Sequence, residues 1–176
     1  MSRVRGGAVL LVLVVGGCGG LAVRQQVQQE APETAVGAPR DLLAEVRAAA
    51  AGGGDLIEVA PLVDPAVADL LEAAGRAEAA GDLGAAAQAL DEALALLPGD
   101  PRILQWRAEL LLAGGELDEA ERLAANSWEL GPRLGELCRR NWATVQLARE
   151  VRGDPEGAQR AAGQRARCEV PAPVRM

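Results

Sequence analysis

The sequence has 176 residues, of which 49% are apolar and only 2% aromatic, and its formal net charge is -7. It contains no histidine and no lysine, which removes histidine-dependent nucleophiles, general bases and metal ligands. The acidic balance excludes the basic footprint that nucleic-acid binding needs. We therefore expect one small domain rich in helix, with no enzymatic activity, no cofactor, no metal and no nucleic-acid partner.

Residues 1–17 have the pattern of a targeting segment. Two arginines precede the apolar run 8–15, which is far shorter than the roughly 20 residues of a membrane-spanning helix. Gly16 and Gly17 then lead into Cys18. This pattern resembles the lipobox of bacterial lipoproteins, in which the signal peptide is cleaved before a cysteine that carries lipid. The resemblance implies that Cys18 is lipidated, and an ordinary secretory signal that contains a cysteine is the alternative.

The lipobox resemblance also implies a location in the cell envelope. Gly19 follows the cysteine, whereas lipoproteins retained in the inner membrane carry aspartate there. We therefore expect a lipid anchor in the outer membrane, with the chain facing the periplasm. Several acyl chains together give stable membrane attachment.

Residues 18–54 are expected to form the lipid anchor and a flexible linker. Glutamine and proline recur in this segment up to residue 40, and few apolar side chains accompany them, so it cannot bury enough surface to order the chain. A short helix is predicted over residues 41–51, from the helical spacing of Leu42, Leu43 and Val46. The sequence leaves open whether residues 41–63 pack on the rest of the chain.

A repeat of 34 residues follows. Several residues recur at this offset, among them the pairs Gly81 and Gly115, Leu83 and Leu117, Ala86 and Ala120, Ala74 and Ala108, and Pro98 and Pro132. Asp-Pro steps at residues 64–65 and 100–101 predict helix starts, because aspartate caps a helix and proline suits its first turn. The glycines predict the turns between paired helices.

These helical pairs resemble the tetratricopeptide repeat. The matching positions are Leu70, Ala73, Ala74, Ala77, Gly81, Ala86, Leu90, Ala93 and Pro98 in repeat 67–100, and Leu104, Ala108, Leu111, Gly115, Ala120, Ala124 and Pro132 in repeat 101–134. A third, less regular unit from residue 139 reads as a capping repeat. The resemblance implies an all-α, short helical solenoid of two clear repeats plus a degenerate capping repeat over residues 55–170, followed by a tail at 171–176.

The last unit contains two cysteines that we expect to form a disulfide. Cys138 and Cys168 are 30 residues apart, and Gly153, the expected turn of the last helical hairpin, lies midway between them. The two residues would therefore face each other across antiparallel helices. An oxidising envelope compartment favours the bond, whereas a redox pair or a metal site lacks the Cys-x-x-Cys motif and histidines such sites use.

Proteins of the tetratricopeptide-repeat family bind segments of partner proteins in a groove lined by the first helix of each repeat. The corresponding positions here are Leu71, Gly75, Glu78 and Ala79, then Arg102, Gln105, Glu109 and Leu112, then Arg140, Ala143, Leu147 and Glu150. We expect Arg102, Gln105, Glu109 and Arg140 to form the partner-binding groove, with Trp106 as a candidate anchor. Trp128 and Trp142 are expected to lie in the core.

The resemblance therefore predicts a non-enzymatic adaptor or assembly factor, anchored in the membrane by lipid, whose partner is an envelope protein or peptide segment. The sequence does not identify that partner. A self-associating structural lipoprotein without a peptide ligand is the alternative. A cell-wall enzyme would require the acidic residues Glu116, Asp118, Glu119 and Glu121 to converge in a cleft, whereas their place at a helix start suits the helix dipole.

Overall fold

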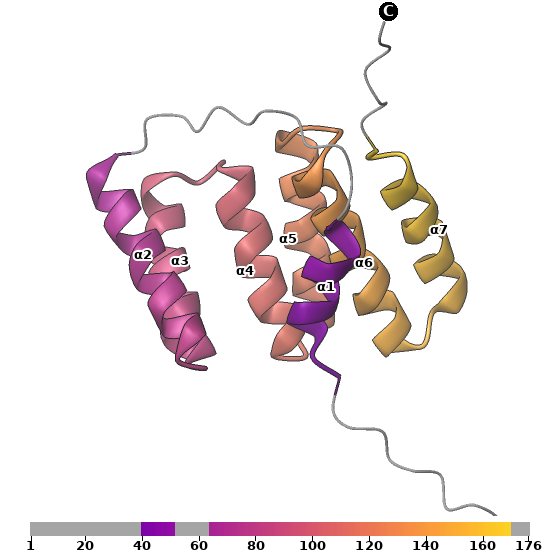
Figure 1. Cartoon of the computed structure of the whole chain (residues 1–176), viewed down its shortest axis with the longest axis horizontal. Coiled ribbons are helices and arrows are strands. Elements are labelled where there is room, and N and C mark those ends of the chain that lie inside the picture. The colour runs from indigo at the N-terminus through magenta and orange to yellow at the C-terminus, as the bar shows by residue number, and fades with distance from the viewer. Residues whose placement is uncertain (1–39, 52–63, 170–176) are drawn as a thin grey trace, which may run out of the picture. The chain divides into compact units, whose positions relative to one another are not determined.

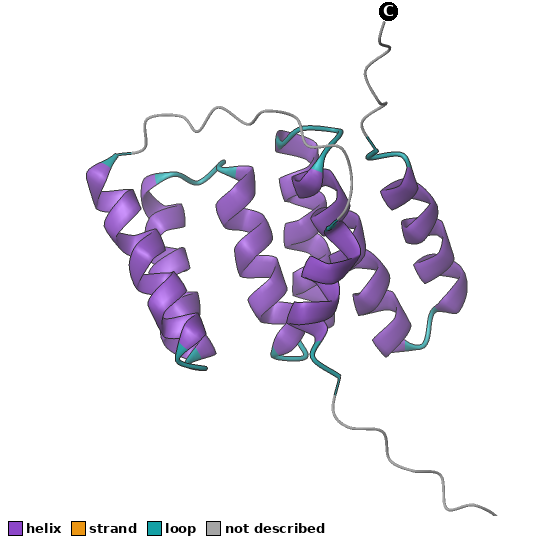
Figure 2. Cartoon of the chain, in the orientation of Figure 1, coloured by secondary structure: helices purple, strands orange, loops and turns teal. Residues whose placement is uncertain are grey.

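The computed structural model of the chain describes residues 40–51 and 64–169. These residues form seven α-helices and no strand (Figure 1, Figure 2), so the expected all-α class is confirmed. The helices are α1 (Leu42–Ala50), α2 (Pro65–Ala79), α3 (Leu83–Leu96), α4 (Pro101–Ala113), α5 (Leu117–Leu130), α6 (Glu136–Arg152) and α7 (Pro155–Ala166).

All seven helices belong to one compact unit, Ala38–Met176. The expected signal peptide 1–17, the lipidation site Cys18 and the tail 171–176 lie outside the described residues. Within the described part of the chain, no helix is long and apolar enough to cross a membrane.

Helices α2 to α7 form three consecutive hairpins that stack along the chain (Figure 1). Each helix packs on its hairpin partner, and neighbouring hairpins join where α3 meets α4 and where α5 meets α6. The hairpin turns fall at Gly81, Gly115 and Gly153, whose φ angles are 79°, 83° and 81°. Glycine adopts this left-handed backbone without the steric cost that other residues carry. The predicted turns are therefore confirmed, including the turn of the irregular third unit.

Aspartates define the starts of most helices. The side chain of Asp100 accepts hydrogen bonds from the backbone N–H groups of Arg102 and Ile103, at 2.8 and 3.2 Å, and Pro101 occupies the first turn. Asp64 caps α2 in the same way. These caps satisfy backbone donors that a helix leaves without a partner at its first turn.

The core between the hairpins is built largely from alanine. Ala74, Ala86, Ala108 and Ala120, which are family signature positions, are fully buried. Leu90 is buried in the cluster of the first hairpin and α4. Such small side chains let helices approach closely while the core stays densely packed, which explains how a chain with so few aromatic residues forms this fold.

The third unit uses polar contacts where its apolar pattern is weak. Its first helix begins at Glu136, three residues before the predicted start. Arg149 of α6 forms an ion pair with Glu121 of α5 and donates to the carbonyl oxygen of Gly157 at the start of α7. The guanidinium therefore joins α6 to both neighbouring helices.

Two tryptophans pack across the junction of the second and third hairpins. Trp128 of α5 and Trp142 of α6 meet edge to face, with ring centroids 5.3 Å apart. The guanidinium carbon of Arg133 lies 3.6 Å from the centroid of the Trp128 ring, a cation–π geometry. Both tryptophans are half-buried rather than enclosed, so they cover the edge of the core that Trp142 contacts.

Helix α1 corrects the expectation of a flexible linker over residues 18–54. Residues 42–50 form a helix whose Asp41 cap accepts a hydrogen bond from the N–H of Ala44 at 3.0 Å. This helix packs on α6 and α4. Val46 and Ala50 are buried, and Val46 belongs to the core cluster that α4 and α6 share. The residue pattern predicts the helix itself. It does not predict that the helix packs on the repeats, because no residue near it in the sequence specifies the surface on which it packs.

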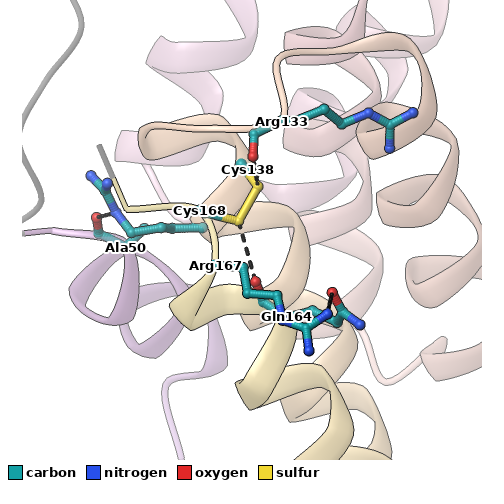
Figure 3. Close-up of a disulfide and its surroundings, with 7 residues drawn as sticks. Ala50, Arg133, Cys138, Gln164, Arg167 and Cys168 are labelled. Carbon is teal, nitrogen blue, oxygen red and sulfur yellow. Dashed lines mark hydrogen bonds between the residues drawn. A yellow bond between two sulfur atoms is a disulfide. The ribbon is translucent and has the colours of Figure 1, made fainter. Parts of the chain in front are cut away.

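The predicted disulfide is present (Figure 3). Cys138 near the start of α6 is bonded to Cys168 just after α7, with Cα atoms 5.6 Å apart, and both residues are buried. The backbone N–H of Gly135 also donates to the carbonyl oxygen of Cys168 at 2.7 Å. The two ends of the last hairpin are thus joined covalently at the point where the chain leaves the repeats.

Replacing both cysteines by alanine is expected to lower the free energy of unfolding by about 3–4 kcal/mol, because the bond closes a 30-residue loop. Urea denaturation followed by circular dichroism measures the change. A reducing agent should shift the wild-type protein to the same midpoint and leave the double variant unaffected. An unchanged midpoint in the double variant would contradict a stabilising role for the bond.

Candidate functional site

The predicted groove residues of α4 and α6 meet in the structure. Both oxygens of the Glu109 carboxylate accept hydrogen bonds from Arg140, each at 2.7 Å. Gln105 donates its side-chain amide to Glu109 at 2.9 Å. Side chains of two repeat units therefore lie together at these positions, and their contacts are polar.

Glu109 and Gln105 lie beneath the surface of this groove. Their side chains have no solvent exposure. The amide of Gln105 also donates to the hydroxyl of Thr144 at 2.8 Å, and that hydroxyl donates to the carbonyl oxygen of Arg140 at 3.0 Å. Thr144 was not among the predicted site residues. These contacts make Gln105 and Glu109 a buried polar centre. Contact of a partner with either side chain stays a prediction, and the burial of both side chains in this structure opposes it.

Helix α1 supplies the cover over this buried centre. The guanidinium of Arg47 donates to both carboxylate oxygens of Glu78 on α2, at 2.6 and 2.9 Å, and its Nε donates to Glu109 at 3.3 Å. One side chain from the expected linker thus bridges the first helices of two repeats. Such charge-assisted, two-pronged hydrogen bonds are stronger than neutral ones.

Two further contacts hold the ends of α1. Arg139 of α6 is buried and donates its Nε to the carbonyl oxygen of Ala50 at 2.6 Å. Ala50 lies at the end of α1, beside the disulfide (Figure 3). At the other end Arg40 lies 3.3 Å from Glu150 of α6. Because a nine-residue helix is unstable by itself, these contacts and the apolar face of α1 keep the helix in place.

A cavity of about 520 Å³ remains open beside α1, and we call it the groove cavity. Four helices line it through Arg47, Leu71, Glu78, Arg102, Ile103, Trp106, Glu136 and Arg140. Three of the five residues expected to form the partner-binding groove therefore line an open space, namely Arg102, Trp106 and Arg140. Leu71 and Glu78, at two further groove positions of the repeat pattern, line it as well. The indole N–H of Trp106 donates to Glu78 at 2.6 Å, which fixes the ring in the wall of the cavity.

The ion pair between Arg47 and Glu78 shifts the pKa of both groups. Hydrogen bonds from Arg47 hold the pKa of Glu78 below its ordinary value, although partial burial opposes the shift, and the indole of Trp106 adds to the lowering. The same contact with Glu78 raises the pKa of Arg47 against the effect of its own burial. The ion pair is therefore formed at neutral pH.

The acidic start of α5 does not converge in a cleft. Glu121 pairs with both Arg149 and Arg152, Asp118 pairs with Arg152, and Glu119 pairs with Arg122. None of these carboxylates lines the groove cavity. Within residues 40–51 and 64–169, no group of three or more histidine, cysteine, aspartate or glutamate side chains is arranged to hold a metal ion.

Comparisons with known proteins agree with this architecture. The tetratricopeptide-repeat family profile matches residues 77–132. The solved globular C-terminal domain of P. aeruginosa LpoP is 30% identical and superposes with a TM-score of 0.56, covering 59% of this chain and 98% of that domain. None of the curated protein sequences matches this chain.

Replacing Arg47 by alanine is expected to detach α1 from the repeats, because the helix loses its contacts with both Glu78 and Glu109. Cleavage after Glu45 by a glutamate-specific protease should become faster, and the free energy of unfolding should fall by about 1–2 kcal/mol. The control is Arg76→Ala, which removes an exposed pair with Glu72 within α2 and should change neither quantity measurably. Equal cleavage rates in both variants would contradict the role given to Arg47.

The contribution of Glu78 should depend on pH. Because its pKa is lower in the folded protein than its ordinary value of 4.5, ionised Glu78 stabilises the fold above that pH, and the stabilisation is lost as the pH falls through the lower folded value. The difference in unfolding free energy between wild type and Glu78→Gln should therefore be largest near neutrality and shrink below pH 4.5. Denaturation series at several pH values measure it, and a difference that grows on acidification would contradict the ion pair.

Proposed function

Because the chain belongs to the tetratricopeptide-repeat family, we propose that it is a lipid-anchored protein of the cell envelope that binds a segment of another envelope protein. It acts as an adaptor or assembly factor and carries out no catalysis. The anchor is the lipid on Cys18, in the outer membrane, and the repeats face the periplasm. The likeness to the LpoP globular domain, which spans nearly all of that domain, supports a location in the envelope.

The observation that carries the proposal is the groove cavity. It lies on the first helices of all three units, which is the surface that repeat proteins of this kind use for partners, and it stays open although α1 is in place. Its wall contains both charged and apolar side chains, as in sites that combine a buried anchor with polar contacts. If the first helices had left no open space at the groove, the alternative of a structural lipoprotein without a peptide ligand would have been favoured.

Site-specific photocrosslinking in the native envelope tests this function. The photoreactive residue replaces Leu71, which is half-buried and lines the groove cavity, whereas Gln105 is unsuitable because it is fully buried. The control replaces Gln159, which is exposed on α7. We expect one recurrent envelope protein to be crosslinked from position 71 and not from position 159. Adducts only with a second copy of the chain would instead establish the self-associating alternative.

The lipid anchor is tested separately. We expect Cys18→Ala to move the protein from the membrane fraction to the soluble periplasmic fraction, because the chain then loses the acyl chains that attach it. Fractionation followed by immunoblotting measures the distribution, with Cys138→Ala/Cys168→Ala as the control for removal of cysteine as such. A variant lacking Cys18 that stays fully in the membrane fraction would contradict lipid anchoring there.

A further inference from the structure

We propose that the groove cavity recognises a glutamate or aspartate side chain together with a large apolar side chain next to it on the partner segment. This inference rests on the proposed function and names the chemistry of the partner. Arg102 binds the carboxylate, and Leu71, Ile103 and Trp106 form the surface against which the apolar side chain packs.

The apolar part of the cavity is formed in advance. Ile103 is almost completely buried, and Trp106 and Leu71 are half-buried against the first core cluster. The indole N–H of Trp106 is already satisfied by Glu78, so what the ring adds to the cavity is apolar. A volume of about 520 Å³ is in the range of sites that enclose small ligands, and it accommodates one large side chain of a partner.

Two of the three arginines in the cavity wall are already neutralised. Arg140 uses its Nε and one terminal nitrogen on the buried Glu109. Arg47 uses both terminal nitrogens on Glu78. Because each of these guanidinium groups faces a carboxylate in two-pronged geometry, neither contributes a strong net positive charge to a ligand in the cavity.

Arg102 differs from these two arginines. Its closest carboxylate is that of Asp100, where the two atoms are 3.5 Å apart, and the other oxygen of Asp100 is occupied by the backbone N–H groups that it caps. The Arg102 side chain is 35% exposed. A guanidinium that lines a cavity with so weak an internal contact is suited to a carboxylate from outside.

Glu136 determines on which side of the groove cavity the carboxylate of the partner binds. It lies in the first turn of α6, is exposed and lines the same cavity, so it repels an acidic group on that side. A carboxylate is therefore favoured on the α4 side, beside Arg102. Because helices of all three units line the cavity, a segment can pass along it, and we assign the carboxylate to a side chain rather than to a chain terminus.

Three N-acetylated dipeptides test the proposal on the full-length protein in detergent. The acidic probe is N-acetyl-Glu-Leu-amide, the matched neutral probe is N-acetyl-Gln-Leu-amide, and N-acetyl-Gln-Leu with a free carboxyl terminus tests a terminal carboxylate. Binding is read from the NMR signal of the Trp106 indole N–H, and the signals of Trp128 and Trp142 serve as internal controls. We expect the acidic probe to bind about fivefold more tightly than the neutral probe.

Variants identify the groups responsible. Arg102→Gln should reduce the preference for the acidic probe to about one, and the neutral probe should bind as before. Glu136→Gln should strengthen binding of the acidic probe alone. Arg160→Gln, which changes an exposed arginine on α7, should leave both affinities unchanged. The opposite signs expected at positions 102 and 136 separate a charge effect from a loss of structure.

Three results would overturn the proposal: equal binding of the acidic and neutral probes, a preference that survives in Arg102→Gln, or no shift of the Trp106 signal at millimolar probe. Tighter binding of the probe with the free terminus would overturn the assignment to a side chain. These outcomes are independent of the crosslinking experiment. A shift of the Trp106 signal without a crosslinked partner would contradict the adaptor function and support the proposed cavity chemistry. A crosslinked partner without a shift of the Trp106 signal would support the adaptor function and contradict the cavity chemistry.

Discussion

The buried carboxylate of Glu109 is the contact on which the arrangement of α1, α4 and α6 depends. It has no exposure to solvent and accepts hydrogen bonds from Gln105 within α4, Arg140 of α6 and Arg47 of α1. A buried carboxylate is costly unless it is paired and hydrogen-bonded. The position of Glu109 therefore favours only those arrangements that bring both arginines to it, and this couples the third unit and α1 to the middle of the solenoid.

The features that could be predicted from the sequence are those with a local signal. Gly81, Gly115 and Gly153 mark turns because of their backbone requirements, and the cysteine pair follows from its symmetric spacing about the last of them. The packing of α1 has no such signal, because Arg47 meets Glu78 and Glu109 only after the solenoid has formed. For the same reason the groove positions could be listed from the repeat pattern, whereas the burial of Gln105 and Glu109 could not.

Helix α1 relates the proposed lipid anchor to the candidate site through the order of the chain. The chain that leads from Cys18 reaches the repeats at α1, and α1 supplies Arg47 to the wall of the groove cavity. Arg139 holds the end of α1 and is adjacent in sequence to the disulfide-bonded Cys138. The disulfide, the last hairpin, α1 and the cavity thus form one connected set of contacts, and ligand binding in the cavity is expected to stabilise the docked position of α1.

Hydrogen–deuterium exchange of the backbone amides of residues 46–50 in the full-length protein measures whether α1 is docked on the solenoid in solution. A docked helix shares the stability of the elements on which it packs. We predict that these amides exchange at rates comparable to those of α4 and α6, far more slowly than an unstructured chain. Exchange at the rate of an unstructured peptide would contradict the docked helix, because a nine-residue helix without tertiary contacts gives almost no protection.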